Sequence, residues 1–248
     1  MNILLTNDDG INATGLKVLA EHLERVGKVS IVAPDRERSA VGHALTLHHP
    51  LRAVKLGTDI FAVDGTPTDC VNLGIHSLIS VKPDIVISGI NHGANLGDDI
   101  TYSGTVSAAM EATLMGIPAF AISLSTGTEG DNFISAARFA VKLAGIIMQR
   151  GLPVDTFLNV NVPDLPPEIL KLPRITSQGK KSYDGMIIDK VDPRGRNYYW
   201  IGSVEVNFID KEGTDYHAVS RGHISITPLH LDLTNYSSLR ELNEWDFS

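Results

Sequence analysis

Two adjacent carboxylates, Asp8 and Asp9, follow a short apolar run at residues 3–5 and precede Gly10. A strand of this kind in a parallel sheet ends at the crevice where open α/β folds bind ligands. Two acidic side chains there are costly to desolvate without a positive partner, and oxygen ligands suit a hard divalent cation. We therefore predict a metal site. An ordinary Asp-Gly turn or a helix cap is the alternative, but either explains only one of the two acids.

A glycine- and amide-rich segment, residues 88–97, follows a third apolar run and falls at the same end of the expected sheet. Its asparagine carbonyls can ligate a hard cation, and its amides can bind phosphate oxygens. The spacing is not that of the dinucleotide-binding fingerprint. A connecting loop rich in turn-forming residues is the alternative, and we interpret His92 within it as a surface residue.

A helix is expected to begin at the turn formed by Ser103, Gly104 and Thr105. The N–H groups and the dipole of a helix start bind anions, and the two hydroxyls add donors. Simple capping by serine or threonine is the alternative. Since phosphate is the anion that most often needs both a metal and such donors, this turn fits beside the predicted metal site.

The second expected strand ends in a charged loop, residues 35–43. Ser39 could supply a hydroxyl ligand to the cation, and Arg36 or Arg38 could face the anion. We interpret Glu37 and one of these arginines as part of a solvated charge cluster.

The chain has 248 residues, 43% hydrophobic and 20% charged, which is typical of a globular protein with a substantial core. Its 21 basic and 29 acidic residues give a net charge of −8, and no basic run exceeds two residues, so we expect no nucleic-acid duplex as a partner. Cys70 is the only cysteine, which excludes an intrachain disulfide and favours a buried role. We expect a cytoplasmic protein without a membrane partner, because no secretory pattern or membrane-length apolar run is present.

Strand-like and helix-like patterns alternate from residue 1 to about 162. This alternation predicts a Rossmann-like α/β fold with a doubly wound, mainly parallel sheet in a three-layer sandwich. The expected strands are residues 3–5, 29–33, 60–63, 84–88, 119–122 and 157–162. The expected helices include residues 16–23, about 105–115 and about 131–150.

Two antiparallel hairpins are expected outside this alternation. Residues 44–47 and 51–54 predict a short hairpin after the second strand. Residues 198–200 and 204–208 predict a projecting C-terminal hairpin, and exposed aromatic strands of that type often pair with another subunit. Thr66 is expected to cap a helix that begins at Pro67.

Five ordered motifs make the chain similar to the SurE family, the stationary-phase survival phosphatases. The motifs lie within residues 5–11, 34–39, 65–69, 88–97 and 102–106. The resemblance covers the whole α/β part and, we expect, the entire chain. It implies a single α/β domain over residues 1–248, with a nucleotide- and metal-binding core at residues 1–162 and a C-terminal hairpin and arm for oligomerisation at residues 163–248.

The same resemblance implies the site residues. One divalent cation, magnesium or manganese, is expected on four oxygen ligands: Asp8, Asp9, Ser39 and Asn91. The expected phosphate-binding residues are Asn95, Ser103, Gly104 and Thr105. Asp8, Asp9 and Asn95 are the expected catalytic residues.

The implied activity is hydrolysis of nucleoside monophosphates through a metal-activated water, as a 5′-nucleotidase with 3′-nucleotides as further candidate substrates. The implied assembly is a homodimer or homotetramer with exchanged C-terminal segments. Two alternatives stay open. One is a haloacid-dehalogenase-like phosphatase with an aspartyl nucleophile, although its acids are two residues apart and those here are adjacent. The other is a non-catalytic nucleotide-binding sensor.

Overall fold

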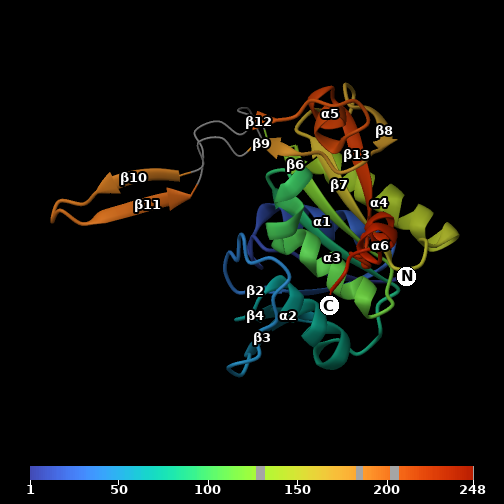
Figure 1. Cartoon of the computed structure of the whole chain (residues 1–248). Coiled ribbons are helices and arrows are strands. Elements are labelled where there is room, and N and C mark those ends of the chain that lie inside the picture. The colour runs from blue at the N-terminus through green and yellow to red at the C-terminus, as the bar shows by residue number, and fades with distance from the viewer. Residues whose placement is uncertain (127–131, 183–186, 202–206, 248) are drawn as a thin grey trace.

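The computed structural model describes residues 1–126, 132–182, 187–201 and 207–247, and its described part is built on one large sheet (Figure 1). The sheet has nine strands in the order β3-β4-β2-β1-β5-β6-β7-β13-β8. Their bounds are β1 (Asn2–Thr6), β2 (Lys28–Pro34), β3 (Ala53–Gly57), β4 (Ile60–Val63), β5 (Ile85–His92), β6 (Ala119–Ser125), β7 (Thr156–Pro163), β8 (Lys171–Ile175) and β13 (His223–His230).

The central six strands, from β4 through β2, β1, β5 and β6 to β7, run parallel to one another. Strands β2, β4 and β3 lie on one side of β1, and β5 and the strands that follow it lie on the other side. The strand order therefore reverses between the neighbours β1 and β5. Open α/β sheets bind ligands at such a reversal, outside the carboxyl ends of the strands. The fold thus predicts the location of the site before any side chain is considered.

Helices cover both faces of the sheet and complete the predicted three-layer sandwich (Figure 1). Helices α1 (Thr14–Leu23) and α4 (Phe133–Arg150) pack on one face against buried side chains that include Ile3 and Leu5. Helices α2 (Pro67–Leu73) and α3 (Gly104–Leu114) pack on the other face, where Leu4 points. Because both faces are covered, successive β1 residues are apolar instead of alternating with polar ones.

The start of α2 confirms the predicted cap. The Thr66 hydroxyl accepts the Asp69 N–H at 3.1 Å, and the Asp69 carboxylate accepts the Thr66 N–H at 2.8 Å. This reciprocal pair satisfies two donors that a helix start leaves without partners. Cys70 in the same helix is fully buried, as expected.

Three sequence expectations about the elements were wrong. Residues 44–47 form no strand; the hairpin after β2 is β3 with β4, closed by a turn at residues 58–59. The strand expected at residues 84–88 continues to His92, with an irregularity between Gly89 and Asn91, so Asn91 lies in β5 and not in a loop. The sheet also continues past residue 162, since β13 pairs with β7 and β8 with β13.

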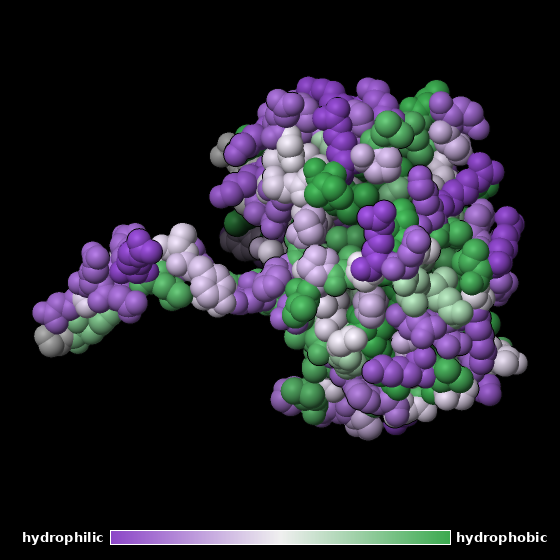
Figure 2. Space-filling view, turned by 90° about the vertical axis from the view of Figure 1, so that its right-hand side faces the viewer, coloured by the Kyte–Doolittle hydropathy of each residue, from purple (hydrophilic) through white to green (hydrophobic). Residues whose placement is uncertain are grey.

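The remaining C-terminal elements lie outside the main sheet. Strands β10 (Ile187–Val191) and β11 (Asn197–Ile201) form an antiparallel hairpin, which we call the arm, and it stands clear of the body in two views (Figures 1 and 2). The projecting hairpin at residues 198–200 is therefore confirmed, but its partner is β10; residues 204–206 lie outside the described residues. Strands β9 (Lys181–Ser182) and β12 (Asn207–Phe208) pair at its base, and helices α5 (Asp215–Ser220) and α6 (Tyr236–Leu242) follow.

Within the described residues no helix combines the length and apolar character needed to cross a membrane. The predicted helix at about residues 131–150 is α4, and Asp131 itself lies outside the described residues.

Candidate metal and phosphate site

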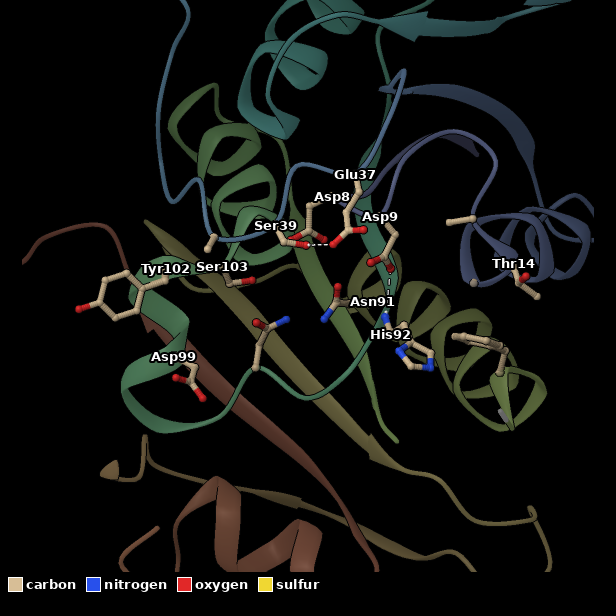
Figure 3. A pocket seen from close by; sticks show the side chains of 15 residues that line it. Asp8, Asp9, Thr14, Glu37, Ser39, Asn91, His92, Asp99, Tyr102 and Ser103 are labelled. Atoms are coloured by element: carbon tan, nitrogen blue, oxygen red, sulfur yellow. Dashed lines mark hydrogen bonds between the residues drawn. The ribbon is translucent and has the colours of Figure 1, made fainter. Parts of the chain in front are cut away.

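A cleft of about 550 Å³ opens at the carboxyl ends of β1 and β5, where the strand order reverses (Figure 3). It brings together segments that are far apart in the sequence, including the ends of two strands, the loop after β2 and the 3-10 helix η2 (Gly97–Tyr102). The lining residues are Asp8, Asp9, Ala13, Thr14, Gly15, Glu37, Ser39, Ala40, Asn91, His92, Asn95, Asp99, Tyr102, Ser103 and Phe133.

The turn after β1 is formed by residues on either side of the carboxylate pair. The Asn7 side chain donates to the Gly10 carbonyl at 3.0 Å and accepts the Gly10 N–H at 3.2 Å. Gly10 has a φ of 96°, and a Cβ there would stand 3.0 Å from the Arg36 backbone carbon. Since Asn7 and Gly10 satisfy the turn, Asp8 and Asp9 are not needed for it, which removes the turn as an explanation of the pair.

Asp8 is buried, with 5% of its surface exposed. Its Oδ1 accepts a hydrogen bond from the Thr105 hydroxyl, and its backbone carbonyl accepts the Arg38 N–H at 2.7 Å. Burial raises the pKa of Asp8 from 3.8 to about 6, the Thr105 hydrogen bond lowers it in part, and the neighbouring Asp9 charge raises it further. A buried carboxylate whose ionised form is this costly gains from a bound cation.

Asp9 is half-buried, and its Oδ2 accepts the His92 N–H at 3.1 Å (Figure 3). Burial raises the pKa of Asp9, while the hydrogen bond from His92 lowers it. This contact joins the loop after β1 directly to the end of β5. The His92 side chain is exposed at the cleft, as predicted.

Ser39 lies beside the carboxylates and donates its hydroxyl to the Glu37 carboxylate at 2.6 Å (Figure 3). Glu37 therefore lines the cleft, although the sequence interpretation placed it in a solvated charge cluster. The two arginines of this loop do not line the cleft, contrary to the suggestion that one faces the anion. Arg38 instead donates to the Asp64 carbonyl at 2.7 Å, and Arg36 is exposed.

The two asparagines of the β5 segment are held by hydrogen bonds. Asn91 donates its amide nitrogen to the Gly93 carbonyl at 2.8 Å, which turns its amide oxygen toward the carboxylates (Figure 3). The Asn95 side chain donates to the Ser123 hydroxyl at 2.8 Å. Its backbone is fixed by buried amides of β7, since Asn159 and Asn161 both donate to the Asn95 carbonyl.

The predicted phosphate turn divides into two roles. Ser103 lines the cleft and caps α3, because its hydroxyl accepts the Val106 N–H at 3.1 Å. Thr105 is fully buried and donates to Asp8. A Cβ on Gly104 would stand 2.9 Å from the Asp8 Cβ, so only glycine lets the helix start pack this closely on the carboxylate. Gly104 thus allows α3 to pack closely on Asp8, and the Thr105 side chain donates a hydrogen bond to Asp8. Neither residue lines the cleft.

The charge of the cleft is strongly negative. Four carboxylates line it (Asp8, Asp9, Glu37 and Asp99), and none of its described lining residues is lysine or arginine. The described residues contain no cluster of three or more His, Cys, Asp and Glu side chains that would form a metal site on their own. The available donors are carboxylate, hydroxyl and amide oxygens, which fit a hard cation that keeps some water ligands.

Fold and cleft together define a class of protein: a doubly wound α/β protein with an acidic, oxygen-rich cleft beside a helix start. Comparison with known proteins specifies the family. The family described as "Survival protein SurE" matches residues 3–185. The chain belongs to the SurE family.

Relatives match over essentially the whole chain. A protein of Geotalea uraniireducens called "5'-nucleotidase SurE" is 73% identical over 248 residues, covering 100% of both chains. One of Geotalea daltonii with the same name is 72% identical over 246 residues, covering 99% of both. The crystal structure of the SurE protein from Aquifex aeolicus is similar with a TM-score of 0.87 and 45% identity, covering 98% of each chain.

Proposed function

We propose that this protein is a metal-dependent phosphatase that hydrolyses nucleoside monophosphates to nucleoside and phosphate, as a 5′-nucleotidase with 3′-nucleotides as further candidate substrates. The observation that carries the proposal is the convergence of Asp8, Asp9, Ser39 and Asn91 in one acidic cleft beside the start of α3. The names of the closely similar relatives support the same activity.

The proposed metal ligands are Asp8, Asp9, Ser39 and Asn91. Magnesium or manganese held by these residues would supply the charge that lowers the pKa of a water and screens phosphoryl oxygens. The chain prepares this set through its own hydrogen bonds: Thr105 orients Asp8, and the Gly93 carbonyl fixes the Asn91 amide.

The proposed phosphate-binding groups are the Asn95 side chain, Ser103 and the backbone N–H groups of Gly104 and Thr105. N–H groups in the first turn of a helix have no partner within the helix and stabilise negative charge on phosphoryl oxygens. Asp8 or Asp9 accepts the proton of the attacking water. Asp9 is the better placed of the two, because Asp8 is buried and already accepts the Thr105 hydroxyl.

A phosphate-release screen tests the proposal. The purified protein is given each nucleoside 5′- and 3′-monophosphate with magnesium, with manganese and with a chelator. We expect release only with metal, and faster from nucleotides than from a simple aryl phosphate.

Two results would favour the alternatives. Nucleotide binding by calorimetry with no phosphate release at excess metal would favour a sensor. A trapped phospho-enzyme or a stable beryllofluoride adduct would favour an aspartyl nucleophile.

We also propose a homodimer or homotetramer in which C-terminal segments are exchanged. The support is the exposed apolar surface of the arm and tail, where Trp200 is 66% and Phe247 82% exposed. The division into a nucleotide-binding core at residues 1–162 and an oligomerisation region at residues 163–248 is part of this proposal, as is a cytoplasmic location.

A further inference from the structure

The base of the arm packs directly against one wall of the cleft. Residues 178–180, which lead into β9, and Lys181 of β9 itself contact the start of η2. Gln178 donates its amide to the Gly97 carbonyl at 3.0 Å, and the Lys181 N–H donates to the Asp98 carboxylate at 3.0 Å. A Cβ added to Gly97 would stand 3.2 Å from the Gly179 backbone, so the two segments touch without intervening side chains.

A buried carboxylate fastens these two segments to a third. Asp215, at the start of α5, is fully buried. Its Oδ2 accepts the Gly97 N–H and its Oδ1 accepts the Gly179 N–H, each at 2.9 Å. The Gly97 contact spans 118 residues of sequence. The segment before the arm, the wall of the cleft and α5 are therefore held as one unit.

Lys181 adds an ion pair at the cleft itself. Its Nζ lies 2.8 Å from the Asp99 Oδ1, and the lysine side chain is only 15% exposed. The nitrogen also lies 5.9 Å from the centre of the Phe208 ring in β12, which stacks on Tyr216 of α5. Lys181 is thus fixed from behind by the base of the arm and points at a residue that lines the cleft.

Asp99 has a particular importance because of where η2 leads. This helix carries Asp99 and Tyr102, which both line the cleft, and it runs directly into Ser103, the cap of α3 (Figure 3). An uncompensated Asp99 carboxylate would repel an anionic substrate in a cleft that already holds three other carboxylates. An ion pair both neutralises this charge and holds the helix in place.

We propose that Lys181 is a positioning residue of the nucleotide site, which acts through Asp99 to fix the η2 wall and to neutralise its charge. The proposal rests on the proposed function, since it concerns binding of the anionic nucleotide. It makes a residue outside the five sequence motifs part of the substrate site, and it connects that site to the base of the arm. None of the four proposed metal ligands takes part in the Lys181–Asp99 ion pair, so loss of this pair should leave their hydrogen bonds in place.

A double-mutant cycle tests it, using Lys181→Met, Asp99→Asn and the double variant with a nucleoside monophosphate. We expect Lys181→Met to raise KM by roughly threefold to tenfold with kcat changed less than about twofold. If Lys181 acts through Asp99, the double variant is no worse than Lys181→Met alone. Lys181→Arg, which keeps the charge, is expected to restore most of the affinity.

Controls separate positioning from general damage. Lys180→Met removes the same charge from the exposed neighbour and should leave KM unchanged. Manganese affinity, measured by calorimetry without nucleotide, should be the same in wild type and Lys181→Met. An unchanged KM in Lys181→Met, additive effects in the double variant, or a parallel loss of manganese affinity would each overturn the inference.

Failure of the proposed function gives a different result. In that case the wild type releases no phosphate with any metal. The same variants are then compared by their nucleotide dissociation constants, measured by calorimetry. We expect Lys181→Met to weaken nucleotide binding and the double variant to be no weaker than Lys181→Met alone.

Discussion

The cleft and the arm break the usual rule of burial in opposite ways. In and beneath the cleft, polar side chains are inside: Asp8, Asn95 and Thr105 are at most 7% exposed. In the arm, apolar side chains are outside: Tyr199 is 63%, Trp200 66% and Ile201 82% exposed. The buried Asp8 carboxylate is costly to ionise even with its Thr105 hydrogen bond, and exposed apolar side chains cost free energy in water. Each region therefore gains from a partner, and the kinds of partner differ.

The two regions also differ in how firmly they are held. Each proposed ligand or phosphate-binding side chain in the cleft is fixed by a neighbour, such as Asn91 by the Gly93 carbonyl or Asp8 by Thr105. The arm is a two-stranded ribbon, which is only marginally stable by itself in water. A preorganised site suits a small ion and an anion, whereas an exposed ribbon suits another copy of a protein surface.

The largest expected effect comes from removing a buried acid of the cleft and comparing it with an exposed acid of the arm. Asp8→Asn should reduce metal-dependent phosphate release from a nucleoside monophosphate by about 1,000-fold or more, because a cation ligand and a charge are lost together. Asp189→Asn in β10 is the matched control and should keep normal turnover per chain. Circular dichroism checks the fold, and near-normal turnover in Asp8→Asn would contradict the assignment.

A second prediction concerns the pH dependence of the cleft. The pKa of Asp8 is raised from 3.8 to about 6, so the folded protein without metal holds this proton more tightly than the unfolded chain. The contribution of Asp8 to the stability of the folded state should fall as the pH rises from about 4 to 6, by up to about 3 kcal/mol. Metal affinity should rise over the same range, because the ligand must lose its proton.

Thermal unfolding with and without manganese measures this effect. The increase in Tm caused by manganese should be larger at pH 7.5 than at pH 5. Asp8→Asn should remove this part of the pH dependence in the metal-free protein. An equal increase at both pH values would show that Asp8 does not take part in binding.

The smallest expected effect on the single chain comes from the arm. Replacing Tyr199 and Trp200 together with serine should reduce the mass of the assembly measured by sedimentation. The free energy of unfolding of the dissociated chain should change by only about 0.5 kcal/mol, because these side chains are exposed. Lys190→Ser, on the paired strand β10, is the control for a change on the same ribbon. An unchanged mass in the serine variant would show that these side chains are not used for assembly.

Much of the architecture could be predicted from the sequence because it depends on local pattern. The apolar runs at residues 3–5 and 119–122 and the helical spacing in α4 each reflect burial of neighbouring residues. The hairpin of β3 and β4 was misplaced because residues 44–47 and 51–54 have strand-like composition, while the pairing depends on contacts across the turn at residues 58–59. Strands β8 and β13 were missed because each contains a proline, which is uncommon within a strand.

The sequence could predict which residues meet at the site, but not which hydrogen bonds they make there. The structure brings Asp8, Asp9, Ser39 and Asn91 to one cleft, and their role as metal ligands stays a prediction. Thr105 illustrates the limit: its hydroxyl could cap a helix, bind phosphate or support an acid, and only the packing of α3 on β1 shows that it donates to Asp8.

The sequence by itself determined the alternating fold and the chemical types of the proposed ligands, because both depend on patterns of residues that are close together in the chain. The tertiary structure alone decided that Glu37 and Asp99 line the cleft and that Lys181 and Asp215 fasten its wall. The Lys181–Asp99 and Asp215–Gly97 contacts join residues 82 and 118 positions apart in the sequence. No local pattern encodes such contacts; only the tertiary packing brings η2, β9 and α5 together.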